Sequence, residues 1–173
     1  MKRPIIFLSI FSILFAQRPG DAAVRAGVDA FYNYEFDKSI EILSQARKDF
    51  PDHPGVHVTW AAAHWRRNEA YLPQDEIYSN LDANLDEIQK IYEDQLEKFP
   101  DHPEYMLYMG TAKGLDARIL LGQKKWVPTL YAAFQGFRII QKAFEKDPYL
   151  TDAYLPIGIV EYYAGLSNVL VQA

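Results

Sequence analysis

The sequence contains no cysteine. This absence excludes disulfide bonds, thiolate zinc sites and thiol nucleophiles, whichever compartment the protein occupies. Basic residues are also scarce, because 18 Lys and Arg stand against 23 Asp and Glu and the formal net charge is -5. A surface that binds nucleic acid needs a basic stripe to displace phosphate counterions, so the composition argues against DNA or RNA as a partner.

No apolar run elsewhere matches the length of the one in the first sixteen residues, MKRPIIFLSIFSILFA. Lys2 and Arg3 precede it, and only two serines interrupt it before Ala16. This pattern is typical of an export signal with a cut after Ala16, and the run is shorter than the about 20 residues that a spanning helix needs. We therefore expect an export signal over residues 1–16 and a protein in the bacterial periplasm, in the cell envelope or outside the cell. An uncleaved membrane anchor and a buried first helix are the alternatives.

Sustained strand-like alternation is absent as well. In residues 75–99, apolar side chains recur every three to five positions, which is the period of an amphipathic helix: Ile77, Leu81, Leu85, Ile88, Ile91 and Leu96. Prolines fall mostly between such segments, where they end one helix or begin another. The 173 residues are 49% hydrophobic, which suffices for one core. The sequence therefore predicts an all-α domain over residues 17–173.

The pentapeptide FPDHP occurs at residues 50–54 and again at residues 99–103, and an altered copy, KDPYLTD, follows at residues 146–152. In each copy a proline stops a helix, and Asp52, Asp101 or Thr151 is expected to cap the next one. The stop prolines are separated by 49 and 48 residues: Pro51, Pro100 and Pro148. A fixed period of this size is typical of helical repeat arrays. We expect units over about residues 21–51, 52–100 and 101–148 and a truncated partial unit over 149–173, so that the chain would be the front part of a longer array.

Small residues recur at fixed offsets from these prolines. Ten residues after each proline the sequence has Ala61, Gly110 and Gly158, and counting back from Pro148 gives Gly136 and Ala143. In the first unit, AGVDAFYNYEFDKSIEILSQARKDFP, the corresponding residues are Gly27, Ser39, Ala46 and Pro51. Small residues that face each other across two helices let the helix axes approach closely. This stretch resembles the tetratricopeptide repeat, and the resemblance extends in degenerate form over roughly residues 21–165.

The resemblance implies antiparallel helix pairs that stack as an α-solenoid, a right-handed superhelix whose first helices line a concave surface for a partner protein. The later units are longer than the first, since Gly27 to Ser39 spans 12 residues and Gly110 to Gly136 spans 26. Tetratricopeptide proteins that hold C-terminal carboxylates do so with Lys and Asn on the first helix. The matching positions here hold Val24 and Val28, so that clamp is not expected.

Six residues are candidates for ligand binding: Tyr32, His57 and His64 on first helices, and Lys124, Lys125 and Trp126 between the helices of unit three. Surface and interhelical packing roles for the histidines and a solvated turn for the lysines are the alternatives. His53, His57 and His64 have metal-ligand spacing, but Pro54 and Gly55 interrupt the helix and no carboxylate completes the set. We expect no metal, no cofactor and no catalytic residue, because no nucleophile lies beside a matched base.

The hypothesis that follows is an exported, non-catalytic scaffold of the tetratricopeptide type that binds other proteins of unknown identity. It predicts no nucleic-acid partner, and any membrane contact would be made by the N-terminal segment or the Lys124–Trp126 loop. The alternative is a helical carrier or enzyme that uses a pocket between the lengthened helices of units two and three. An open groove would favour the scaffold, and a deep enclosed cavity would favour the alternative.

Overall fold

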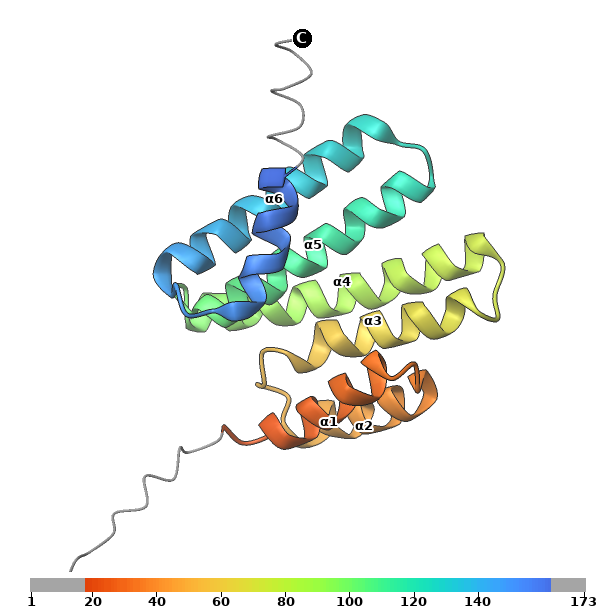
Figure 1. Cartoon of the computed structure of the whole chain (residues 1–173), viewed down its shortest axis with the longest axis horizontal. Helices are drawn as coiled ribbons and strands as arrows, with labels where there is room; N and C mark the ends of the chain where they lie inside the picture. The colour runs from red at the N-terminus through yellow and green to blue at the C-terminus, as the bar shows by residue number, and fades with distance from the viewer. Residues whose placement is uncertain (1–17, 163–173) are drawn as a thin grey trace, which may run out of the picture.

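The computed structural model describes residues 18–162, which fold into the α-helices α1 to α6, a short 3-10 helix and a last helical segment (Figure 1). The helices are α1 (Asp21–Tyr32), α2 (Phe36–Asp49), α3 (Val56–Glu69), α4 (Gln74–Lys98), α5 (Pro103–Gly122), α6 (Trp126–Lys146) and η1 (Thr151–Ala153), and residues 154–162 are helical too. The described residues contain no strand, so the predicted all-α class is confirmed. The export signal predicted for residues 1–16 and the end of the partial fourth unit lie outside the described residues.

The helices form three successive pairs, α1–α2, α3–α4 and α5–α6, and each helix packs against the next in the chain (Figure 1). The first helices of neighbouring pairs also touch, because α1 contacts α3 and α3 contacts α5. The largest core cluster joins α3, α4 and α5 and contains Leu81, Leu85, Ile88 and Tyr92, each at most 1% exposed. The first helix of each pair therefore contacts the first helix of the next pair.

The connections between pairs share one backbone geometry. Helices α2, α4 and α6 each end two residues before a stop proline. The N–H of the residue before that proline donates to the carbonyl four positions earlier, at 2.8, 2.8 and 3.0 Å for Phe50, Phe99 and Asp147. The carbonyl of the same residue accepts the N–H three positions later, at 3.0, 3.1 and 3.2 Å. The altered third copy of the pentapeptide thus has the same hydrogen bonds as the first two.

The turns within the first and third pairs also match. Tyr34 and Lys124 adopt left-handed backbone angles, with φ of 63° and 59°. In each turn the next residue, Glu35 or Lys125, donates its N–H to a carbonyl five positions earlier, at 2.9 and 3.0 Å. A left-handed conformation is unfavourable for a residue with a side chain. The left-handed residue lets the chain reverse its direction within three residues in both turns.

Small residues bring the helices of the first and third pairs together. The Ser39 hydroxyl is fully buried and donates to the Gly27 carbonyl at 2.8 Å. In the third pair, a Cβ added to Gly136 would lie 2.7 Å from the Gly110 carbonyl oxygen, and a Cβ on Gly110 would lie 2.8 Å from the Gly136 carbonyl. The backbones of α5 and α6 are therefore in direct contact. Ala46 and Ala143, each at most 2% exposed, complete these interfaces.

Gly158 does not share this packing. It is exposed, and a Cβ at this position would meet no described atom within 4 Å. Pro51, Pro100 and Pro148 are exposed in the connections, where they stop the helices without entering the core.

The second pair is held differently, by hydrogen bonds to the connection before it. Ala61 and Ile88 are fully buried, and the buried Tyr92 hydroxyl donates to the Pro54 carbonyl at 2.7 Å and accepts the Val58 N–H at 3.3 Å. Tyr92 thereby satisfies a free donor in the first turn of α3.

The predicted aspartate and threonine caps are wrong. Neither α3, α5 nor η1 has a side-chain cap of its own. The Asp52 carboxylate instead accepts the Gln95 amide at 2.7 Å, and Asp101 pairs with Lys146 at 2.5 Å. Side chains from α4 and α6 draw these aspartates away from the helix starts, and Thr151 lies within η1 itself.

The Tyr92 hydroxyl is expected to contribute measurably to stability. Tyr92→Phe leaves the Pro54 carbonyl and the Val58 N–H buried without a partner, which costs about 1–3 kcal/mol. Chemical denaturation should show this decrease in the free energy of unfolding. Tyr71→Phe is the control, because Tyr71 is 70% exposed and should tolerate the change. Equal stability of the wild type and Tyr92→Phe would contradict the capping role.

Two glycines of the third pair should respond oppositely to alanine. Gly136→Ala places a methyl group against the Gly110 carbonyl and should destabilise the protein by about 1–3 kcal/mol through overpacking. At Gly114, in the same helix pair, a Cβ would meet no atom within 4 Å. Gly114→Ala should therefore stabilise the protein by about 0.5–1 kcal/mol through reduced backbone entropy. Thermal unfolding of both variants measures the contrast, and effects of the same sign would refute it.

Candidate functional site

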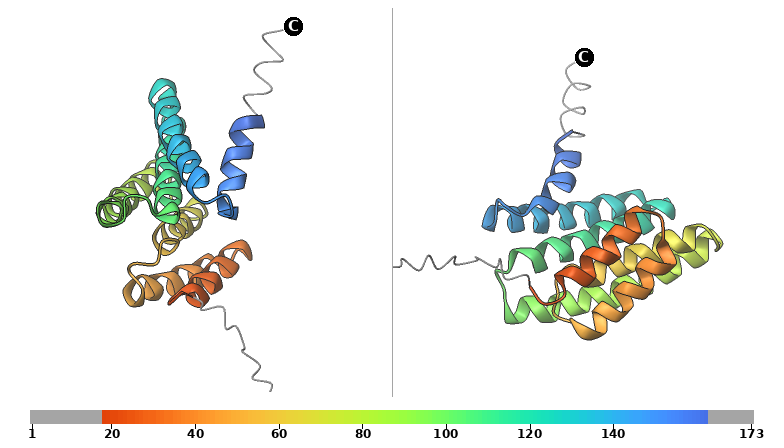
Figure 2. Two further views of the ribbon diagram at one scale, coloured as in Figure 1. Left: turned by 90° about the vertical axis from the view of Figure 1, so that its left-hand side faces the viewer. Right: turned by 60° about the horizontal axis from the view of Figure 1, so that its bottom comes forward.

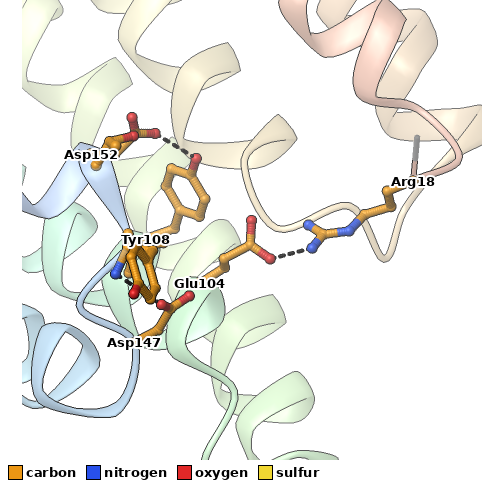
Figure 3. Close-up of a pocket in the computed structure, with 8 residues that line it drawn as sticks. Arg18, Glu104, Tyr108, Asp147 and Asp152 are labelled. Atoms are coloured by element: carbon orange, nitrogen blue, oxygen red, sulfur yellow. Dashed lines mark hydrogen bonds and ion pairs between the residues drawn. The ribbon is translucent and has the colours of Figure 1, made fainter. Parts of the chain in front are cut away.

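A cleft of about 390 Å³ opens at the N-terminal end of α5 (Figure 3). Three segments meet there: Arg18 before α1, the first turns of α5, and the connection from α6 to η1. Its lining residues are Arg18, Glu104, Tyr108, Asp147, Tyr149, Leu150, Thr151 and Asp152. Stacking of the pairs brings these segments together, because α5 contacts α3 and α6 while α1 contacts α3.

One wall of the cleft is an ion pair between Arg18 and Glu104, which joins the start of α1 to the first turn of α5 (Figure 3). The hydrogen bond that the Arg18 guanidinium donates to the Glu104 carboxylate raises the pKa of Arg18. The Arg18 backbone N–H also donates to the Asp21 carboxylate at 2.9 Å, which ties the residues just before α1 to its first turn. The Arg18 charge is therefore largely compensated within the cleft.

The opposite wall carries two aspartates whose partners are neutral. The Tyr108 hydroxyl donates to Asp152 Oδ2 at 3.1 Å, and burial raises the pKa of this hydroxyl, so it remains a donor. Asp147 Oδ1 accepts the Tyr149 N–H at 3.0 Å. The Tyr149 ring is 89% exposed at the rim of the cleft. Neither carboxylate has a cationic partner among these contacts.

The cleft is acidic as a whole, because Glu104, Asp147 and Asp152 outnumber the single cation Arg18. Carboxylates form their strongest hydrogen bonds with charged donors, so this arrangement suits a Lys or Arg side chain or an amino group. The exposed Tyr149 ring adds an aromatic surface on which such a cation can stack. Within residues 18–162, no group of three or more His, Cys, Asp or Glu side chains is placed to hold a metal ion.

Reasoning from the sequence did not find this cleft. Arg18 and Glu104 are 86 residues apart, and no local pattern links them. One signal was present, since Glu104 and Asp152 each lie four residues after a stop proline. The period therefore placed two acids at equivalent positions, but only the stacking of the pairs brought them to one cleft.

The structure corrects the expectation for His57, which is 3% exposed and lies inside the fold. Its Nε2 donates to the Pro51 carbonyl at 2.7 Å, and its Nδ1 accepts the Arg47 Nε–H at 3.1 Å. Burial lowers the pKa of the imidazole. His57 thus holds α3 to the end of α2, with both of its ring nitrogens engaged within the fold.

The other candidates lie in separate parts of the molecule. Tyr32 is 74% exposed at the end of α1, and His64 on α3 is half-buried against the Trp60 ring at 4.4 Å. Lys124, Lys125 and Trp126 are exposed at the α5–α6 turn, in the third pair (Figure 1). The structure therefore does not gather the six predicted residues into one site.

Comparisons of this chain with protein-family models, with curated proteins and with solved structures found no match. Inferences about function therefore rest on the chain's own residues and their geometry. Among the described helices, none has the length and apolar character to cross a membrane.

His57 should make the protein less stable in mild acid. Because its pKa is lowered on folding, the unfolded chain binds more protons, and stability should fall as the pH drops below the ordinary histidine value of 6.5. One such group adds a slope of at most about 1.4 kcal/mol per pH unit. Urea unfolding between about pH 8 and 5 should give a shallower slope for His57→Gln than for the wild type. Identical slopes would show that His57 does not carry the effect.

Proposed function

We propose that the protein is an exported, non-catalytic scaffold of the tetratricopeptide repeat type, whose helix pairs stack as a right-handed α-solenoid and bind another protein. The observation that carries this proposal is the recurrence of one hydrogen-bond pattern at Phe50, Phe99 and Asp147, together with the contacts of α1 with α3 and of α3 with α5. In a repeat array each unit contacts only its neighbours, and the stacked first helices present an extended surface.

The acidic cleft is the part of this surface with the clearest chemistry. It lies where Arg18, the first turns of α5 and the η1 connection meet, so several repeats contribute to it. We assign it to a Lys or Arg side chain of the partner, held by Asp147 and Asp152 and flanked by Tyr149. A partner segment that supplies such a residue would lie along the N-terminal ends of the first helices.

The alternative, a carrier or enzyme with a pocket between the lengthened helices, receives less support. A cleft does lie there, lined by Asp75, Tyr78, Ser79 and Asp82 of α4 and by Gln123. Its volume is about 280 Å³, and it is open to solvent. Sites for small molecules enclose roughly 300–1,000 Å³ and bury most of the ligand. The dimensions of this cleft therefore favour the scaffold.

A peptide-display selection on the purified chain tests the proposal. Enriched peptides should carry Lys or Arg at a fixed position. The double variant Asp147→Asn with Asp152→Asn should bind them about tenfold or more weakly, because each hydrogen bond to a charged group is worth about 1.5–3 kcal/mol. Asparagine keeps the oxygens that accept from Tyr149 and Tyr108, so the fold should be retained. Isothermal titration with an enriched peptide measures the loss.

The matched control removes the same charge elsewhere, as Asp75→Asn with Asp82→Asn in the cleft beside α4. Its affinity should equal that of the wild type. Equal weakening by both double variants would show only a general attraction of cations to an acidic protein. Failure of the selection to enrich any peptide would count against the scaffold itself.

A further inference from the structure

Helix α6 exposes a continuous apolar stripe in its first half. Val127, Leu130, Tyr131 and Phe134 are 77%, 71%, 66% and 60% exposed, and their spacing places them on one side of the helix. We call these four residues the α6 apolar face. The opposite side of the helix, with Ala132, Gly136, Ile140 and Ala143, is the side that is buried. The α6 apolar face is therefore additional to the core of the third pair.

The repeat itself gives a measure of how unusual this face is. The residues Phe99 and Asp147 are structurally equivalent, so α4 and α6 align with an offset of 48 residues. The positions of α4 that correspond to the α6 apolar face are, in order, Ser79, Asp82, Ala83 and Asp86, all exposed. Helix α4 leaves this side in solvent although another helix pair follows it. Stacking of a further pair on α6 would therefore not account for the apolar residues.

The charge of this region also departs from the rest of the chain. Residues 117–144 contain five cations and no Asp or Glu: Arg118, Lys124, Lys125, Arg138 and Lys142. Helix α4 carries eight acids and two bases over its 25 residues. Lys124 and Lys125 precede the α6 apolar face, and the Arg138 guanidinium follows it, 6.0 Å from the centre of the Phe134 ring. Cations therefore bracket the stripe at both ends.

We propose that the α6 apolar face docks on an anionic membrane surface. A helix with apolar and aromatic side chains on one face and Lys or Arg around it lies in the plane of a bilayer interface, with its apolar side among the acyl chains. Trp126, 64% exposed, and Tyr131 have rings with one apolar and one polar edge, the type found at headgroup level. The cations supply the attraction to acidic headgroups.

The shape of the region favours a membrane over a helical peptide. Figure 2 shows the turn end of the α5–α6 pair projecting from the stack, with residues 154–162 leaving α6 at an angle. Ile157 packs against the core cluster that contains Ile140 and Ala143 of the second half of α6, whereas the four residues of the α6 apolar face in its first half stay at least 60% exposed. Amphipathic peptides commonly lay their apolar side into a hydrophobic groove. A single projecting face is suited to a bilayer.

The absence of cysteine allows a local test in the full chain. A single cysteine at Val127, labelled with an environment-sensitive fluorophore, should show blue-shifted and stronger emission with phosphatidylcholine vesicles that contain phosphatidylglycerol. Vesicles of phosphatidylcholine alone should give a weaker response, and salt should reduce the signal. The matched control is the same label at Ser79, the equivalent position on α4, which should not respond. The N-terminal segment is identical in both proteins, so membrane attachment through it cannot produce the difference.

A second pair of variants separates burial from charge. In the labelled protein, Leu130→Asp introduces the residue that α4 carries at this position and should weaken vesicle binding by more than about tenfold. Ala83→Asp adds the same charge to α4 and should leave binding unchanged.

A third variant tests the cations, because Lys124→Gln should lower the affinity for acidic vesicles about fivefold. The lipid assignment is overturned if the label at Val127 does not respond to acidic vesicles, or if Leu130→Asp binds them as well as the wild type. It is equally overturned if the label responds only on self-association or to a protein partner.

Discussion

The close approach of paired helices is the constraint on which this fold depends. In the third pair the carbonyls of Gly110 and Gly136 each occupy the space that a Cβ would need on the other helix. In the first pair the Ser39 hydroxyl contacts the Gly27 carbonyl directly. Because the helices meet through backbone atoms, their relative position has little freedom. This contact determines which side of α6 is buried, and hence which side presents the α6 apolar face.

The second pair meets the same geometric demand with larger residues and polar contacts. Ile88 and Tyr92 replace small residues at the interface, and the hydroxyl of Tyr92 compensates by donating to a carbonyl of the connection before α3 and accepting an N–H of the first turn of α3. Gln95 adds a hydrogen bond to Asp52. Helix α4 therefore anchors the FPDHP connection. His53, which is 9% exposed, ties the same connection to α1, because its Nε2 lies 2.9 Å from the Asp21 carboxylate.

Charge is distributed unevenly over this fold. The cleft at the start of α5 is acidic, α4 exposes acids along its length, and the α5–α6 turn is basic and apolar. Figure 1 shows α5 lying between α4 and α6, so the acidic and basic helices occupy different sides of the stack. Surface charges interact weakly beyond a Debye length of about 10 Å. We propose that the two regions serve different partners: a cationic side chain at the cleft and an anionic surface at α6.

The sequence by itself determined the helical class and the ends of α2, α4 and α6, because apolar period and proline act over a few residues. The tertiary structure alone decided which side chains meet. Asp52 was predicted to cap α3, yet its carboxylate accepts the Gln95 amide, and both ring nitrogens of His57 are hydrogen-bonded, to Arg47 and to the Pro51 carbonyl. Arg18 reaches Glu104 across 86 residues. Periodicity identifies the apolar side of a helix, but burial and pairing depend on the neighbour that packs there, and only the stacked pairs supply that neighbour.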